Sequence, residues 1–309
     1  MHFFEKANYD FVKVRRKAML VSLIIILAGF ASIALHRGLE TSIDFAGGAL
    51  VEIGLQNPVP VHDVRTIVSN AGFKDAEITR FGVESNYLIK VKNIGSEGSA
   101  MGDSTTAGAV ANTIKDALKK GFADQTVVVR RVETVGPKIG GELRKAAFWA
   151  IIYSLIGILI YVSWRFQFRF AVAAIIATMH DVLVMLAFFS FAGLEISTSG
   201  IAAILTIVGY SLADTVVVFD RIRENLGLRR REDFGTLINT SINETLSRTI
   251  ITSGTVMLTL IALLVFGGEV IREFSLAMTV GIVAGTYSSI FIAAPILLEW
   301  QMWKPTKNK

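Results

Sequence analysis

One acidic residue stands inside a long apolar stretch of the sequence, where a charge is unfavourable. Asp214 follows Gly200 by about 14 residues, or about 21 Å of helix, in an otherwise aliphatic segment. Tyr210 and Ser211 precede it by about one turn and share its face. Apolar surroundings favour the neutral carboxyl and a nearby cation favours the carboxylate, so this aspartate can bind and release a proton. The alternative is a fixed hydrogen bond or ion pair between helices; we favour proton handling.

A cation that could meet this carboxylate lies at the edge of the next apolar segment. Arg248 stands there among hydroxyl side chains, namely Ser247, Thr249, Thr252, Ser253 and Thr255. An arginine at a span end often extends toward lipid headgroups. The neighbouring hydroxyls favour instead a polar face turned toward the helix bundle. We therefore predict Asp214 and Arg248 as a proton relay.

The third apolar segment contains a second acidic residue, beside a histidine. His180 and Asp181 lie about 11 residues from one end of that segment, near the middle of a membrane. Asp181 fits two roles equally well: a further step in a relay, or a structural partner for His180 or for a polar group of another helix.

The last apolar segment combines small residues with hydroxyls. Gly281 and Gly285 have the spacing that lets two membrane helices approach closely, and we expect packing as their main role. Tyr287 and its neighbouring hydroxyls could line a polar seam. Beyond the fourth segment, Asp220 and Arg221 continue the helix, and a charged helix end in water explains them in part.

The elements that carry these residues follow from composition. Of 309 residues, 52% are hydrophobic and only 18% are charged, which is typical of membrane proteins. A spanning helix needs about 20 mostly apolar residues. The first window is not a cleaved signal, since it lacks a small-residue cleavage site and further spans follow. Six windows qualify: Ala18–Leu35, Ala146–Val162, Phe170–Ala192, Gly200–Phe219, Ile250–Phe266 and Phe274–Leu298.

Lys and Arg are unevenly distributed around these windows, and this bias predicts orientation. They gather before the first window, in the second–third and fourth–fifth connections and in the tail, whereas Gly193–Ser199 has none. We therefore expect both termini in the cytoplasm. The predicted organisation is a cytoplasmic segment at 1–17, a transmembrane helix at 18–36, a periplasmic domain at 37–143, transmembrane helices two to six at 144–300 and a cytoplasmic tail at 301–309.

The exported segment alternates predicted strands and helices. Strands are expected at Gly48–Leu55, Ala76–Phe81, Tyr87–Val91 and Thr126–Val135, and helices at Val61–Ala71 and Thr105–Phe122, with a Gly/Ser-rich loop at Gly95–Gly102. The order β-α-β-β-α-β predicts a ferredoxin-like domain. The predicted fold class is thus a polytopic α-helical membrane protein, with six transmembrane helices forming an RND-like half and an α+β ferredoxin-like periplasmic domain.

The sequence resembles the SecF family of bacterial protein-export membrane subunits, within the RND (resistance–nodulation–division) superfamily. The resemblance runs nearly end to end, and several long motifs in the right order make it specific. These motifs are IDFAGGAL at Ile43–Leu50, GYSLADTVVVFDRIREN at Gly209–Asn225, INETLSRTIITSGT at Ile242–Thr255 and GTYSSIFIAAP at Gly285–Pro295.

The resemblance implies a multi-pass protein of the bacterial inner membrane that works with a partner, SecD, beside the SecYEG translocon. It implies use of the proton-motive force to assist translocation of unfolded exported polypeptides. Protons or sodium ions could be the coupling ion.

The resemblance also implies residue roles. Asp214 would be the protonatable membrane carboxylate and Arg248 its cationic counterpart. The family usually has Asn immediately before this aspartate, where the chain has Ala213. Supporting residues of the same signature would be Thr215, Asp220 and Arg221, and Gly47 and Gly48 would belong to a first periplasmic motif.

Other classes of function fit less well. A proton-driven small-molecule or lipid exporter of the same superfamily usually has two six-span halves and larger exported domains. An intramembrane aspartyl protease would need a Gly-x-Gly-Asp motif, and this motif is absent because Asp214 follows Leu212 and Ala213. The enzyme motifs HExxH and GxSxG are also absent. The absence of cysteine removes thiolate sites. We expect no cofactor, no metal and no nucleic-acid partner. A purely structural scaffold would not depend on the charge of Asp214.

Overall fold

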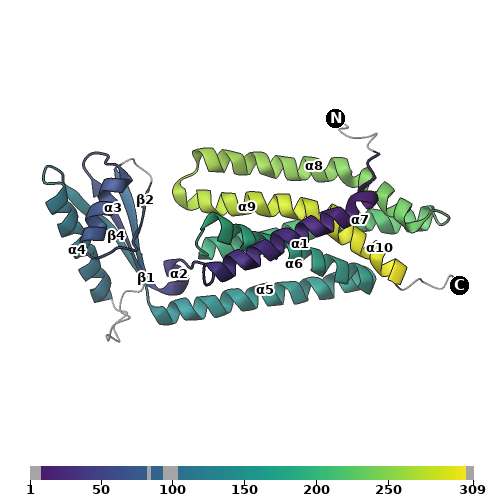
Figure 1. Cartoon of the computed structure of the whole chain (residues 1–309), viewed down its shortest axis with the longest axis horizontal. Coiled ribbons are helices and arrows are strands. Elements are labelled where there is room, and N and C mark those ends of the chain that lie inside the picture. The colour runs from purple at the N-terminus through teal and green to yellow at the C-terminus, as the bar shows by residue number, and fades with distance from the viewer. Residues whose placement is uncertain (1–7, 82–84, 93–103, 304–309) are drawn as a thin grey trace.

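The chain forms a small sheet domain at one end of a long helix bundle. The computed structural model describes residues 8–81, 85–92 and 104–303. The described chain begins and ends at the end of the bundle far from the sheet, and α2 (Ile43–Ala46) lies at the junction (Figure 1). The predicted Gly95–Gly102 loop lies outside the described residues.

The sheet domain contains four strands and two helices in the order β-α-β-β-α-β. The strands are β1 (Gly48–Leu55), β2 (Glu77–Arg80), β3 (Asn86–Lys92) and β4 (Val127–Val135), and the helices are α3 (Val61–Asn70) and α4 (Ser104–Gly121). Each bound falls within one residue of its prediction, because period-two apolar patterns and flanking turn residues are local signals. The sheet order is β2-β3-β1-β4, and all the neighbouring strands are antiparallel.

The two helices cover one face of this sheet. Val51 and Ile53 of β1 and Ile89 of β3 are fully buried against residues of α3 and α4, including Val64 and Ile114. The opposite side chains, such as those of Leu50 and Leu88, point toward the bundle. The sheet therefore presents its second face to the ends of the membrane helices (Figure 1).

Among the described residues, six helices are long and apolar enough to cross a membrane. The first five are α1 (Phe11–Leu35), α5 (Pro137–Arg165), α6 (Phe168–Ala192), α7 (Thr198–Leu228) and α8 (Phe234–Phe266). The helices α5, α7 and α8 extend well beyond the predicted apolar windows. Hydropathy detects only the part of a helix in contact with lipid, whereas the helix begins where its caps lie. At the start of α8, Asp233 accepts hydrogen bonds from the Gly235 and Thr236 amides.

The sixth spanning helix changes its geometry partway. It runs as α9 (Glu269–Ser288), a π-helical turn η1 (Ser289–Ala293) and α10 (Ala294–Trp303). Pro295 follows shortly after the π-helical turn. It has no N–H to donate, and its ring crowds the carbonyl one turn back, so the preceding turn widens. Turns of this kind are rare in proteins and are often found at functional sites.

Glycines bring α9 against its neighbours. A Cβ atom at Gly281 would overlap the side chain of Ile207 in α7 and lie 3.1 Å from Met185 Sδ in α6. A Cβ at Gly285 would lie 2.9 Å from Ser211 Cβ in α7. The backbone of α9 therefore packs directly on α7, as the GxxxG spacing predicts.

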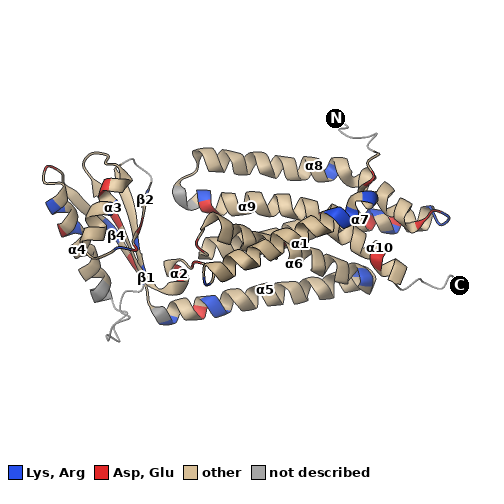
Figure 2. Cartoon of the chain, viewed as in Figure 1, with Lys and Arg blue, Asp and Glu red and all other residues tan. Residues whose placement is uncertain are grey.

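Charged residues are concentrated in the sheet domain and near the helix ends, and long stretches of the bundle between them carry few charges (Figure 2). Fully buried apolar side chains fill that stretch, including Ile204, Ile207 and Ile282. This distribution matches a molecule that crosses hydrocarbon with its middle part.

The α7–α9 contact predicts the outcome of a size change. Gly281→Leu would force the two helices apart and lower the free energy of unfolding by about 1–3 kcal/mol. Gly157→Leu, at an exposed site of α5 where an added Cβ would meet no atom within 4 Å, is the matched control and should leave stability unchanged. The measurement is unfolding of the purified chain in mixed micelles titrated with SDS. Equal stability of the two variants would contradict the packing account.

Candidate functional site

Asp214 lies between three segments of the bundle. Its Oδ1 accepts a hydrogen bond of 2.8 Å from Thr249 Oγ1 of α8, and its Oδ2 accepts one of 2.7 Å from Ser289 Oγ of η1. The side chain is half-buried. Each carboxylate oxygen thus has a hydroxyl donor from a different segment, so the charge state of Asp214 affects the contacts of α7 with both.

Arg248 acts on this carboxylate electrostatically without touching it. Among the described residues no ion pair within 4.0 Å joins the two, so any effect of the guanidinium on Asp214 acts through space. The hydroxyls of α8 are divided between two faces: Thr249 and Ser253 are buried, whereas Thr252 is exposed on the same side as Arg248. The sequence analysis expected Arg248 on an inward polar face. The helix instead turns Thr249, the next residue, toward Asp214.

A second carboxylate is buried completely at the centre of the bundle. Asp181 of α6 has no exposed surface. Its Oδ2 accepts hydrogen bonds from Ser211 Oγ of α7, at 2.5 Å, and from Ser288 Oγ of α9, at 2.8 Å. Its Oδ1 lies 2.9 Å from His180 Nδ1. Asp181 therefore joins three helices, and Ser211 connects it to the helix that carries Asp214.

Tyr287 extends this polar region to the first helix. Its hydroxyl donates to the Ala18 carbonyl at 2.7 Å and accepts from Ser22 Oγ at 3.1 Å. Its ring stacks on that of His180, with centroids 6.0 Å apart. In contrast, the hydroxyls of Tyr210 and Thr215 are buried with no hydrogen-bond partner in the described part of the chain. The structure therefore brings Tyr287, but neither of these two, into a hydrogen-bonded network.

Asp220 and Arg221 belong to a separate, more exposed network. Arg221 pairs with Glu224 and with Glu244 of α8, both at 2.7 Å, while Asp220 lies 3.4 Å from Arg165. These pairs join the ends of α5, α7 and α8 away from the sheet. They do not contact Asp214, which lies about one and a half turns or more back along α7.

The opposite end of α7 is attached to the sheet domain. Asp44 Oδ2 of α2 accepts a hydrogen bond of 2.8 Å from the backbone N–H of Thr198, the first residue of α7. The backbones of Thr41 and Ile196 form a parallel bridge beside it. Gly47 ends α2 with a φ of 79°, which favours glycine. At Gly48, a Cβ would overlap the backbone of β3. The two glycines thus shape the turn that places Asp44.

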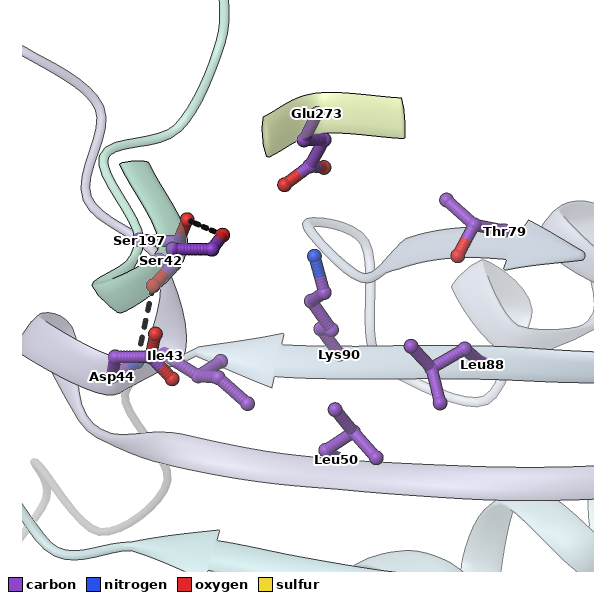
Figure 3. Close-up of a pocket in the computed structure, with 10 residues that line it drawn as sticks. Ser42, Ile43, Asp44, Leu50, Thr79, Leu88, Lys90, Ser197 and Glu273 are labelled. Atoms are coloured by element: carbon purple, nitrogen blue, oxygen red, sulfur yellow. Dashed lines mark hydrogen bonds between the residues drawn. The ribbon is translucent and has the colours of Figure 1, made fainter. Parts of the chain in front are cut away.

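A pocket of about 150 Å³ lies at this junction (Figure 3). Lys90 extends from β3 toward Glu273 of α9, while Leu50 and Leu88 lie along the sheet (Figure 3). Lys90 also pairs with Glu77 at 3.0 Å. Beside the pocket, Lys92 of β3 forms an ion pair with Glu195 in the connection before α7. Ion pairs as well as hydrogen bonds of the backbone therefore hold the sheet domain to the bundle.

These charges shift the proton affinities at the junction. Burial raises the pKa of the Glu195 carboxyl above its ordinary value, and the Lys92 ammonium opposes this rise. Burial lowers the pKa of Lys90, but the carboxylates of Glu77, Glu273 and Glu195 outweigh it and leave that pKa above its ordinary value.

Some of the contact residues were missed by the sequence analysis. Thr249, Ser288 and Ser289 supply the donors to the two carboxylates, yet only their general hydroxyl character was noted. The adjacent serine pair before Pro295 is the signal that could have indicated them. Across the described residues, no group of three or more His, Cys, Asp or Glu side chains could hold a metal ion.

Comparison with known proteins places these features in a family. Residues 113–303 match the family described as protein export membrane protein SecD/SecF, C-terminal. The chain is 44% identical to the protein translocase subunit SecF of Desulfurispirillum indicum over 94% of this chain and 91% of that protein. It is also 44% identical to the protein of the same name from Thermodesulfovibrio yellowstonii, over 95% of both chains.

The fold is also similar to solved structures. A crystal structure of SecDF from Thermus, titled as a translocon-associated membrane protein, matches with a TM-score of 0.80 and 38% identity. A second SecDF structure, in a super-membrane-facing form, matches with a TM-score of 0.74 and 36% identity. Each match covers 98% of this chain but 40% of the longer SecDF chain. These matches and the six apolar helices show a polytopic helical membrane protein.

The raised pKa of Glu195 predicts a pH-dependent junction. The docked sheet domain holds the Glu195 proton more tightly than an undocked one, where the pKa is ordinary. Docking is thus strongest below the ordinary value of about 4.5, and this contribution is lost as pH rises through the raised pKa. Spin labels on cysteines replacing Asp116 of α4 and Arg230 beyond α7 would measure the separation, since the chain has no native cysteine.

We expect the docked population to increase from pH 8 to pH 5 in the native chain. Glu195→Gln carries no titrating charge and should lose this dependence. Glu232→Gln, at the far end of the bundle, is the control and should retain it. The explanation fails if Glu195→Gln shows the native pH dependence.

Proposed function

The chain belongs to the SecD/SecF family of protein export membrane proteins, and we propose that it is a Sec protein-export subunit powered by proton movement. It would act with SecD beside the SecYEG translocon to assist the passage of unfolded polypeptides, as a transport accessory subunit and not as an enzyme. The observation that carries the proton-coupling part is the position of Asp214 on α7 between hydroxyl donors of α8 and η1.

Proton binding at Asp214 would change the packing of three segments. The carboxylate accepts from both Thr249 and Ser289. A protonated carboxyl has one O–H donor, so a hydroxyl that faces this O–H must reorient from donor to acceptor. Arg248 stabilises the charged form and thereby limits how tightly the proton is held. The energy available is about 2.3 kcal/mol per charge per 100 mV of membrane potential, together with the pH difference.

Movement of α7 would reach the sheet domain at the junction. α7 is a continuous helix whose first residue, Thr198, is bonded to Asp44. The second spanning helix, α5, also touches α2, because a Cβ at Gly140 would lie 2.7 Å from the Phe45 carbonyl oxygen. Movement is therefore proposed to be transmitted through α5 and through α7, which carries both Asp214 and the Asp44 contact.

The sheet domain is proposed to be a ferredoxin-like module on the periplasmic side of the inner membrane. The β-α-β-β-α-β order and the sheet order β2-β3-β1-β4 support this fold assignment. The excess of Lys and Arg at the opposite end of the bundle supports cytoplasmic termini.

A polar stripe on α8 supports the need for a partner subunit. Arg248, Thr252, Thr255 and Thr259 are all exposed and recur at about one-turn spacing. Each of the three threonines bonds a carbonyl of its own helix. The Arg248 guanidinium has no hydrogen bond or ion pair to any described residue. A guanidinium in contact with hydrocarbon is unfavourable, so a second membrane chain covering this stripe is favoured over lipid. We assign that place to SecD.

The proton-coupling proposal is tested by secretion into inverted membrane vesicles with and without a proton gradient. Asp214→Asn keeps the side-chain shape but cannot ionise, and Arg248→Met removes the cation. Each should reduce gradient-stimulated export to the level measured without a gradient. Asp116→Asn on α4 and Arg230→Met beyond α7, both exposed and remote, should retain native stimulation. Full stimulation in both site variants would overturn the proposal.

The partner surface is tested by co-purification. Thr255→Trp adds bulk within the stripe and should lower the amount of SecD recovered with the chain severalfold. Ile160→Trp adds similar bulk at a residue of α5 that is 65% exposed, and should leave recovery unchanged. Undiminished recovery with Thr255→Trp would place the partner elsewhere.

A further inference from the structure

Two adjacent serines of the last spanning helix bind two different buried carboxylates. Ser288, the final residue of α9, donates to Asp181 of α6, and Ser289, the first residue of η1, donates to Asp214 of α7. Adjacent side chains of an α-helix point about 100° apart, so one helix can face two neighbours in this way. The junction between α9 and η1 is therefore hydrogen-bonded to both acidic residues, Asp181 and Asp214.

Each serine also has a second acceptor within reach. Ser289 Oγ lies 2.7 Å from Asp214 Oδ2 and 3.0 Å from the Thr286 carbonyl oxygen. Ser288 Oγ lies 2.8 Å from Asp181 Oδ2 and 3.1 Å from the Gly285 carbonyl oxygen. A hydroxyl has a single hydrogen, so each serine donates either to its carboxylate or to its own helix. The pair can thus change partners without moving far.

Asp181 is held by donors from every side. Ser211 and Ser288 donate to one oxygen, and His180 Nδ1 faces the other. His180 Nε2 is buried with no partner among the described residues, so the ring contacts Asp181 through Nδ1 alone. Asp181 is consequently anchored, whereas Asp214, half-buried and near Arg248, is the group with access to exchange.

The two carboxylates are linked by two routes. Through α7, Ser211 binds Asp181 and precedes Asp214 by one turn. Through α9, Ser288 and Ser289 bind one carboxylate each. At Gly285, a Cβ would lie 2.9 Å from Ser211 Cβ, so α9 and α7 touch at this level. A shift of Ser288 at Asp181 would therefore also move Ser289 at Asp214, and the reverse.

We propose that Asp181 is a positioning residue for the proton site: with Ser288 it sets α9 so that Ser289 faces Asp214. This inference rests on the proposed function of Asp214. When a proton binds Asp214 Oδ2, that oxygen becomes a donor, the Ser289 hydrogen turns to the Thr286 carbonyl, and Ser289 Oγ accepts. The Ser288–Asp181 bond holds the adjacent residue in place while this exchange occurs.

The other titratable or charged groups near the two sites come from each packed helix. These groups are His180 of α6, Tyr210 of α7, Arg248 of α8 and Tyr287 of α9, and α1 contributes the Ser22 hydroxyl through Tyr287. Variants that test Asp181 must therefore leave these residues intact.

The test uses the intact complex with its partner in proteoliposomes. Infrared spectroscopy follows the protonated carboxyl band that disappears in Asp214→Asn, as a function of pH. Ser288→Ala loosens α9, so Ser289 donates less well to Asp214, and the midpoint of the band should move about one unit to higher pH, a tenfold change in proton affinity. Ser275→Ala is the matched control, because Ser275 is a fully buried serine of the same helix whose hydroxyl has no partner among the described residues.

A double-variant cycle separates positioning from general packing. Asp181→Asn should move the midpoint as Ser288→Ala does, and the double variant should move it no further. A native midpoint in Ser288→Ala, with a shifted one in Ser289→Ala, would overturn the inference. The band does not depend on export. Full gradient-stimulated export in both Asp214→Asn and Arg248→Met would instead overturn the proposed function, even if the band and its shifts were observed.

Discussion

The structure depends on giving hydrogen-bond donors to a carboxylate away from bulk water. Asp214 obtains one donor from α8 and one from η1, so three segments distant in sequence must meet at one depth. Buried polar groups are tolerated when they are bonded, and an unbonded carboxylate would be strongly unfavourable. The glycine contacts of α9 with α7 make this meeting possible. The hydrogen bonds to Asp214 therefore require the close helix packing that these glycines allow.

The helix α7 is long enough to connect the Asp214 site with the sheet domain. The helix contains 31 residues, or about 46 Å of rise, and carries Asp214 near its middle. Its first residue is bonded to Asp44, and its last turns join the exposed ion pairs of Arg221 and Glu244. The helix is continuous over this length, so the carboxylate and the contacts at both ends belong to one unbroken element.

The sequence was informative where signals are local and less so where they depend on helix rotation. Strands of the sheet domain could be located within one residue, and Asp214 stood out because a charge in an apolar run is rare. The facing of α8 could not be read in the same way. Its hydroxyls surround the helix, and only packing decides that Thr249 turns inward while Arg248 turns outward. The partners of Ser288 and Ser289 depend likewise on packing, which decides the neighbouring helix that each hydroxyl faces.

That wide turn has a consequence for how relatives should be aligned. A π-helical turn holds one more residue than an α-helical turn, and the helices on either side keep their original faces. Removing one residue from Ser289–Ala293 would restore regular winding and leave Leu297 and Leu298 buried as they are. A single-residue gap here in a relative would mark loss of the π-helical turn in an otherwise unbroken span. Chain length at this position therefore carries information that residue identity alone does not.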